Sequence, residues 1–381
     1  MSTVTEIRPA TGQEAARILA EASREGQTVR LRGGQTKAGW GCATADADLE
    51  LGTGGLREIT EHNQGDLTAV LDAGVPFAAA QARFAQAGQM LALDPPLGAG
   101  DAATVGGVVA TADSGPLRHR YGGPRDLVIG VTVALADGTI AKSGGKVIKN
   151  VAGYDLAKLY AGSFGTLGLI LSVSVRLHPL PNGGTTALGA ATDPDTLAAT
   201  AVAIARMPLE FEAVDVAWRG GRGGLLLRCA GREHARRASR AARRLQELGL
   251  AGVDTTGDDQ ALWERQRAGQ RSRQAALVRI VAPAAGLAGV LRAADAVEGT
   301  LVGRAALGTS YVELAPERIA ELRAALPGAA VATVLDAPAS VRGDASLWGE
   351  TSSRGLTLMR AVKAGFDPTG TLNPGVFVGG I

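Results

Sequence analysis

The sequence predicts an α+β fold divided between two domains, and three local patterns support this prediction. Thr11 and Glu14 form a capping box, which marks the start of a helix. Asp137-Gly138 joins two β-rich runs over residues 127–141 and predicts a hairpin. Beyond residue 184, two rounds of a helix with paired strands predict an antiparallel sheet that carries helices on one face.

The elements of the first part follow from apolar periodicity and turn residues. The capped helix has an apolar face that includes Ile18 and Leu19, and it stops at Gly26. A short strand over residues 28–32 leads into the abrupt turn at residues 33–37. Pro76 is expected at the first position of a second helix, which ends near residue 87. Strands are also predicted at residues 48–51, 67–72 and 167–177.

The proline and glycine cluster at residues 179–184 is the strongest boundary signal in the chain. We therefore divide the sequence into residues 1–180, a smaller domain at residues 181–340 and a C-terminal segment at residues 341–381. The helices predicted in the smaller domain lie at residues 195–206, 232–248, 285–295 and 316–325. Its predicted strands lie at residues 212–218, 224–230, 276–281, 300–305, 309–314 and 328–334, with a looser stretch before residue 276.

The composition excludes several classes of protein. With 381 residues, 46% of them apolar, the chain is long enough for two cores, and a net charge of +2 gives no nucleic-acid footprint. Cys42 and Cys229 are too few for an iron–sulfur cluster, a zinc site or a disulfide framework, and both are expected to be buried. No run approaches the roughly 18 apolar residues of a membrane span. Residues 1–9 lack a signal-peptide pattern, so we expect a cytoplasmic protein, with peripheral docking onto a membrane complex left open.

Residues 98–170 are the most informative stretch, because 15 of these residues are glycine. Glycine turns let the backbone approach a ligand, and their bare amides form anion-binding concavities. Several such turns indicate a long ligand that carries phosphate. Thr104-Val105-Gly106-Gly107 would open a helix whose N-terminal amides face an anion. The turn at residues 33–37 offers amides, a hydroxyl and an ammonium, although a plain connection between strands remains equally open.

Other nucleotide and catalytic motifs are absent. Gly98-Ala99-Gly100 resembles a Rossmann fingerprint, but the prolines before it cannot lie in a central strand. The histidines have no metal-ligand spacing, which predicts no metal site. His62 is expected on a surface turn, whereas His119 lies within the glycine-rich stretch. Four arginines could bind a carboxylate or simply be solvated: Arg222, Arg228, Arg279 and Arg304.

Taken in order, ten motifs resemble the FAD-linked oxidases of the vanillyl-alcohol oxidase type. They are Arg32 to Lys37, Asp66 to Gly74, Asp94-Pro95-Pro96, Ala103 to Gly107, Ser114-Gly115, Arg120-Tyr121-Gly122, Asp126 to Val131, Gly144 to Leu156, Gly162 to Ile170 and Leu372 to Gly375. The resemblance covers residues 5–180 and 360–381. It implies a PCMH-type FAD-binding domain of two α+β subdomains with a small antiparallel α+β cap domain. It also implies that residues 341–381 return to the FAD domain.

The resemblance implies FAD as the cofactor. It assigns residues 33–36 to the pyrophosphate, residues 104–107 and 114–115 to the pyrophosphate and isoalloxazine, and Ile170 to a backbone contact. Some relatives attach the flavin through a histidine in the first glycine turn, and Gln35-Thr36 here implies non-covalent binding. The cofactor-binding residues implied are Arg32, Gly33, Gly34, Gln35, Thr36, Lys37, Pro95, Thr104, Val105, Gly106, Gly107, Ser114, Gly115, Tyr121, Gly165, Ile170 and Asn373.

The departures from the family concern catalysis. Relatives that oxidise 2-hydroxy acids carry a histidine cluster in the cap, whereas residues 181–381 contain only His234, and Phe164 stands where relatives often have glutamate. No catalytic residue is therefore assigned. Within the family the chain is similar to the short FAD-binding subunits of bacterial glycolate oxidases. The expected function is that of a subunit in a complex that oxidises glycolate, a small 2-hydroxy acid, to glyoxylate.

That function would need two partners: a larger FAD-linked subunit carrying the substrate histidines, and an iron–sulfur subunit that receives the electrons. Two alternatives remain. One is a stand-alone FAD-dependent 2-hydroxy-acid dehydrogenase with an unrecognised base, such as Tyr154 or His119. The other is a non-redox scaffold subunit with a degenerate flavin site.

Overall fold

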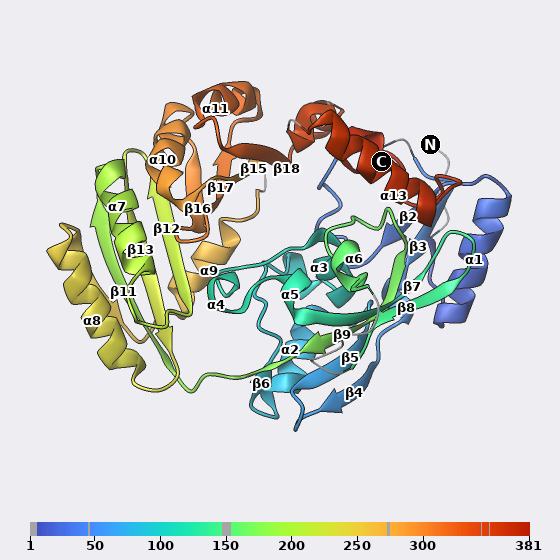
Figure 1. Cartoon of the computed structure of the whole chain (residues 1–381), viewed down its shortest axis with the longest axis horizontal. Helices are drawn as coiled ribbons and strands as arrows, with labels where there is room; N and C mark the ends of the chain where they lie inside the picture. Colours follow the sequence, from blue (N-terminus) through green and yellow to red (C-terminus); the bar gives the residue numbers. More distant parts are fainter. Residues whose placement is uncertain (1–5, 45, 147–153, 273–274, 344, 350) are drawn as a thin grey trace. The chain divides into compact units, whose positions relative to one another are not determined.

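The computed structural model describes residues 6–44, 46–146, 154–272, 275–343, 345–349 and 351–381, and Figure 1 labels their helices and strands. Contacts divide the chain into two compact units. Unit 1 comprises residues 1–114, 121–180 and 351–381, and unit 2 comprises residues 115–120 and 181–350. Both units combine helices with sheets, so the predicted α+β class is confirmed.

Unit 1 is built on a parallel and an antiparallel sheet. The parallel sheet has the order β1-β3-β2, from Glu6–Ile7, Leu49–Gly52 and Val29–Arg32. The antiparallel sheet has the order β4-β5-β9-β7-β8, from Ile59–Asn63, Thr68–Asp72, Leu169–Arg176, Val128–Ala134 and Ile140–Gly144. β6 (Gln89–Met90) pairs with β10 (His178–Pro179). The predicted hairpin is confirmed as β7 and β8, with Gly138 at φ +85° in its turn.

The helices of unit 1 pack on these sheets. They are α1 (Gly12–Arg24), α2 (Phe77–Ala85), α3 (Val105–Thr111), α5 (Pro124–Leu127), α6 (Ala157–Tyr160) and α13 (Ser353–Phe366), with 3-10 turns η1 (Thr53–Gly55), η2 (Ala99–Asp101) and η6 (Val378–Gly380). The Thr11 cap of α1 is confirmed, because Thr11 Oγ1 accepts from the Glu14 amide at 3.1 Å. Glu14 reaches back as expected but accepts from the amide of Ala10, one residue before the N-cap, at 2.8 Å. Pro76 precedes α2 as its N-cap, so its placement at the first helical position was wrong.

The C-terminal segment adds to the parallel sheet. The Val29 amide donates to Thr371 O at 2.7 Å, and the Asn373 amide donates to Val29 O at 3.0 Å. Leu372 is fully buried in a core cluster with Leu19, Val29 and apolar residues of β3 and β9. A segment more than 300 residues away in sequence therefore fixes β2, the strand that leads into the first glycine turn.

Unit 2 is an antiparallel sheet with helices packed on it. The strand order is β14-β11-β13-β12-β16-β17-β15-β18, from Ala251–Thr256, Gly184–Ala191, Arg222–Ala230, Ala213–Arg219, Thr300–Arg304, Thr309–Leu314, Ala276–Val281 and Val331–Asp336. The helices are α7 (Pro194–Ala205), α8 (His234–Glu247), α9 (Gln260–Ala268), α10 (Leu287–Ala296), α11 (Ile319–Ala325) and α12 (Ala339–Arg342). The remaining short elements are α4 (Arg118–Tyr121), η3 (Ala284–Gly286), η4 (Pro316–Arg318) and η5 (Ala345–Trp348).

Several elements differ from the sequence-based prediction. β11 was not among the predicted strands. It begins directly at the expected boundary, and its run of glycine, threonine and alanine lacks the alternation of bulky and polar residues that marks a strand. The looser stretch before residue 276 contains β14 and α9. His62 lies in β4 rather than on a surface turn, with its Nε2 2.9 Å from Gln89 Oε1. Cys42 is half-buried, whereas Cys229 is buried as expected.

Candidate functional site

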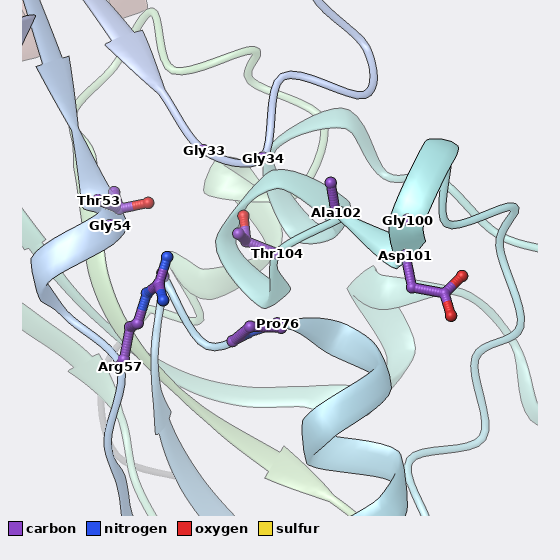
Figure 2. Close-up of a pocket in the computed structure, with 11 residues that line it drawn as sticks. Gly33, Gly34, Thr53, Gly54, Arg57, Pro76, Gly100, Asp101, Ala102 and Thr104 are labelled. Atoms are coloured by element: carbon purple, nitrogen blue, oxygen red, sulfur yellow. The ribbon is translucent and has the colours of Figure 1, made fainter.

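A cavity of about 260 Å³ in unit 1 brings together four turns that are distant in sequence (Figure 2). One turn follows β2, a second is η1, a third precedes α2, and the fourth runs from η2 to the start of α3. The residues that line it are Gly33, Gly34, Thr53, Gly54, Arg57, Gly74, Pro76, Gly100, Asp101, Ala102 and Thr104.

Glycine is required where these turns meet. A Cβ on Gly34 would lie 1.6 Å from Ala102 O, and a Cβ on Gly74 would lie 1.9 Å from Thr53 O. Such separations are far inside van der Waals contact, so a side chain at either position would push the backbones apart. The two glycines thereby hold the first turn against the residues before α3, and η1 against the turn before α2.

The first glycine turn presents unused backbone donors. Within the described residues, the amides of Gly33, Gly34, Gln35 and Thr36 make no hydrogen bond. Gln35 has φ +56°, in the left-handed region that non-glycine residues seldom adopt. Successive bare amides in such a turn form a concavity that binds an anion. The assignment of residues 33–36 to a phosphate stays a prediction from the sequence.

The helix that follows Thr104 does not present its amides as expected. The Val105 amide donates to Val75 O at 3.0 Å, and the Gly106 amide donates to Ala73 O at 2.8 Å. The Gly107 amide donates to Thr104 Oγ1 at 3.3 Å. The prediction that the first amides of α3 face an anion was therefore wrong, because the turn before α2 and the N-cap already accept from them.

The predicted cationic residues of the first turn are also engaged. Lys37 Nζ lies 3.3 Å from Asp113 Oδ2, and both side chains are buried. Arg32 forms an ion pair with Glu50 on the neighbouring strand β3. The ammonium of Lys37 thus joins the first glycine turn to the residues after α3, and it is not a free partner for phosphate.

Arg57 is a cavity residue that the sequence did not single out. It is exposed and follows η1, and Figure 2 shows its side chain pointing toward Thr104. Asp101 also lines the cavity, and its carboxylate points away from Thr104 in the same view. No motif surrounds Arg57 in the sequence, and it follows η1, whose backbone packs closely against Gly74.

Asn373 and Gly165 lie behind the first glycine turn rather than in the cavity. Asn373 Oδ1 accepts from the Leu31 amide at 2.8 Å, and its Nδ2 donates to Phe164 O at 2.7 Å. Gly165 has φ +72°, and a Cβ there would lie 2.7 Å from Asn373 Nδ2. The C-terminal asparagine therefore ties β2 to the loop at residues 162–168.

Gly33, Gly34 and Thr104 are the predicted site residues that line this cavity. Ile170 lies in β9 opposite Val133, with its side chain in the core. Tyr121 is half-buried, with its ring centroid 4.8 Å from that of His178. The other predicted residues outside the lining are Arg32, Gln35, Thr36, Lys37, Pro95, Val105, Gly106, Gly107, Ser114 and Gly115, and of these Gly115 belongs to unit 2. Residues 147–153 of the predicted motif at residues 144–156 lie outside the described residues.

The candidate arginines of unit 2 differ in their environment. Arg228 bonds Glu212 at 2.6 Å and Asp259 at 3.0 Å. Arg304 is fully buried against Asp215 at 2.8 Å. Arg222 is exposed at the start of β13, whereas Arg279 is half-buried and its Nε has no hydrogen-bond partner among the described residues. Arg304 Nη2 also lacks a partner among the described residues, but Arg304 is sealed in the core, so Arg279 is the half-buried candidate with an unpartnered donor.

The histidines of unit 2 are placed differently from one another. His234 Nδ1 lies 2.8 Å from Thr185 Oγ1, which fixes the ring at the start of α8. His119 Nδ1 is buried and unpartnered within the described residues. Burial, with a smaller contribution from Arg120, lowers the pKa of His119. The ring of His119 therefore favours its neutral form, which can accept a proton.

Comparison with known proteins identifies two parts of the chain. Residues 5–144 match the family described as the FAD binding domain, and residues 345–377 match the C-terminal domain of FAD linked oxidases. The chain is 39% identical over 125 residues to glycolate oxidase subunit GlcE of Escherichia coli (strain K12), covering 33% of this chain and 35% of that protein. It is 35% identical over 173 residues to D-lactate dehydrogenase of Archaeoglobus fulgidus, covering 45% and 38%. The chain thus spans little more than a third of the length of these relatives.

Solved structures share the fold. Chitooligosaccharide oxidase aligns with a TM-score of 0.69 and 15% identity over 96% of this chain and 89% of that one. An alkyldihydroxyacetonephosphate synthase aligns with a TM-score of 0.70 and 12% identity over 97% and 76%. The predicted PCMH-type fold with an α+β cap is confirmed. In the described residues, no helix is long and apolar enough to cross a membrane, and no group of side chains has the composition of a metal site.

Proposed function

We propose that this chain, which belongs to the FAD-linked oxidases and takes FAD as its cofactor, is the FAD-binding subunit of a glycolate oxidase-type complex. The complex would oxidise glycolate, a 2-hydroxy acid, to glyoxylate. The observation that carries this proposal is the match to a glycolate oxidase subunit, GlcE, together with a cap that lacks a histidine cluster. A larger FAD-linked subunit would supply the substrate histidines, and an iron–sulfur subunit would receive the electrons.

The unit 1 cavity fits the phosphate end of FAD. The bare amides of Gly33 and Gly34 in its lining, those of Gln35 and Thr36 in the same turn, and the close packing at Gly34 match a pyrophosphate, which needs donors and a nearby backbone. Its volume is slightly below the range of about 300–1,000 Å³ that is typical of ligand pockets, so it would enclose only part of the dinucleotide. Non-covalent binding is proposed because the first glycine turn carries Gln35 and Thr36 and no histidine. When bound, the flavin supplies two-electron redox chemistry.

The described residues of unit 2 offer few side chains that could bind a 2-hydroxy acid or take its proton. Oxidation of a 2-hydroxy acid needs a base near the hydroxyl and a cation for the carboxylate. Arg228 and Arg304 are held by buried carboxylates, and His234 is bonded to Thr185. Two cysteines in the whole sequence cannot hold an iron–sulfur cluster. These features support a chain that depends on partners for both steps.

The test compares the isolated chain with the assembled complex under anaerobic conditions. We expect the isolated chain to show flavin absorption. The bound flavin should stay oxidised after glycolate or D-lactate is added. The complex, purified with its partners, should be bleached rapidly by glycolate. Rapid bleaching of the isolated chain would overturn the dependence on a partner, and a complex inert to glycolate would overturn the substrate.

A second candidate is a stand-alone FAD-dependent 2-hydroxy-acid dehydrogenase. The unpartnered Nδ1 of His119 and the similarity to a D-lactate dehydrogenase favour it. On this view the isolated chain would be reduced by D-lactate, and His119→Gln would abolish the reduction without removing the flavin. A third candidate is a non-redox scaffold subunit with a degenerate flavin site, for which the purified chain would be colourless even after incubation with FAD.

A further inference from the structure

The geometry points to Arg57 as the residue that supplies positive charge to the pyrophosphate of FAD and sets the affinity for the dinucleotide. This inference rests on the proposed flavin-binding role of unit 1. Arg57 belongs to none of the glycine motifs, and it reaches the cavity from the opposite wall, through η1.

The first step is a comparison of the cations near the cavity. Lys37 is paired with Asp113, Arg32 with Glu50, and Arg8 with Glu6 at 2.9 Å. Arg57 lines the cavity, and within the described residues it has neither an ion pair nor a side-chain hydrogen bond. A pyrophosphate carries negative charge that bare amides alone neutralise weakly, whereas a guanidinium matches its oxygens in geometry.

The second step is the position of the guanidinium. A Cβ on Gly54 would lie 3.9 Å from Arg57 Nη2, so the side chain folds back beside the η1 backbone. η1 is itself fixed, because Gly74 lets Thr53 O and Leu56 O approach closely. In Figure 2 the guanidinium lies on the side of the cavity occupied by Thr53 and Gly54 and points toward Thr104. Arg57 therefore approaches the cavity from a fixed turn.

The third step concerns the donors that α3 does not offer. The amides of Val105 and Gly106 are taken by the turn before α2. A phosphate in this cavity would therefore meet the amides of the first glycine turn on one side and Arg57 on the other. Asp101 adds the opposing charge at the rim, which makes a compensating cation more important.

The experiment measures dissociation constants of the flavin-free chain for FAD, for ADP and for riboflavin. ADP carries the pyrophosphate and adenosine without the flavin, and riboflavin carries the flavin ring without phosphate. Arg57→Gln should weaken FAD and ADP binding by roughly tenfold, the usual scale for losing one charge-assisted hydrogen bond, and leave riboflavin unchanged. Arg57→Lys should retain part of the affinity, because it keeps the charge without the fork of donors.

Arg17→Gln is the matched control, because Arg17 is an exposed arginine on α1 outside the cavity lining. It should bind FAD and ADP like the natural chain. The salt dependence of ADP binding should become shallower in Arg57→Gln, since screening acts on the lost charge. If Arg57→Gln fails to fold, Arg57→Lys decides the matter: a partial loss of affinity for FAD and ADP with riboflavin binding unchanged supports the assignment, and unchanged affinity for all three overturns it.

Two outcomes would overturn the assignment. The first is a folded Arg57→Gln chain that binds FAD and ADP within twofold of the natural chain. The second is an equal loss for FAD and riboflavin, which would place Arg57 away from the phosphates. Failure of the natural chain to bind FAD at all would instead overturn the proposed function.

Discussion

Lys363 fastens the C-terminal segment to unit 1, and replacing it with methionine should destabilise that unit strongly. Lys363 Nζ donates to Thr166 O at 2.8 Å, to Leu372 O at 2.9 Å and to Asp367 Oδ2 at 2.5 Å. All three protons of the ammonium are thus used, and the Lys363 side chain is only 12% exposed. Burial lowers the pKa of Lys363, and the bond to Asp367 opposes this shift.

The size of the expected loss in stability follows from the Asp367 carboxylate, which the substitution leaves without its cation. The Asp367 side chain is fully buried, and removing one partner of a buried pair typically costs about 3–5 kcal/mol. The amides of Thr371 and Leu372 still donate to Asp367, so we expect the lower end, about 3 kcal/mol. For a unit of this size that corresponds to a fall in melting temperature of roughly 6–12 °C.

Thermal unfolding followed by circular dichroism measures this loss, with Lys158→Met as the control. Lys158 also pairs with an aspartate, Asp155, but both side chains are 46% exposed, so the control should cost less than about 1 kcal/mol. The double variant Lys363→Met with Asp367→Asn should be more stable than the sum of its single losses. The reasoning is refuted if Lys363→Met melts within 1 °C of the natural chain.

Two further predictions concern the glycine turn and the charge pair of unit 2. Gly34→Ala should lower FAD affinity by roughly tenfold or more, because its Cβ would lie 1.6 Å from Ala102 O, whereas Gly65→Ala, with open space around it, should not. An unchanged affinity in Gly34→Ala would contradict the close approach. Burial, opposed by Arg304 and Gln266, raises the pKa of Asp215 to about 6. Because the folded pKa lies above the unfolded one, this stability is present below about pH 4 and is lost as pH rises through about 6. The free energy of unfolding, measured by urea denaturation, should therefore fall by about 3 kcal/mol from pH 4 to pH 7 relative to Asp215→Asn, and parallel profiles would contradict this.

The sequence predicted those elements whose signals are local. The helix cap at Thr11, the hairpin at Gly138 and the paired strands β16 and β17 depend on residues within a few positions of one another. β11 carried no such signal, because its residues are small and its place in the sheet comes from pairing with β13 and β14 on either side. Pairing with strands that are distant in sequence stabilises β11 as a strand, although its composition has low β-propensity.

In the candidate site too, features with a local sequence pattern were predicted, and features that depend on distant contacts were not. The turn at residues 33–36 was predicted because consecutive glycines after a strand are a local pattern, and its amides are indeed unpaired among the described residues. The fates of the Val105 and Gly106 amides depend on the carbonyls of residues 73 and 75, which no local pattern around Thr104 reveals. Arg57 escaped notice for the same reason, since its position depends on the contact between Gly74 and Thr53. A motif fixes the backbone that it contains, and packing decides which donors remain free.

Unpartnered polar groups occur in the described residues of both units, and those around the unit 1 cavity are open to a ligand. The amides of residues 33–36 and the guanidinium of Arg57 belong to residues that line or adjoin a cavity. In unit 2, Asp215 Oδ1 and Arg304 Nη2 also lack partners among the described residues, yet both side chains are sealed from solvent. Buried unsatisfied atoms of this kind accept a water molecule more readily than a substrate. The half-buried Arg279 differs from them, because its unpartnered Nε belongs to a side chain that keeps some exposure.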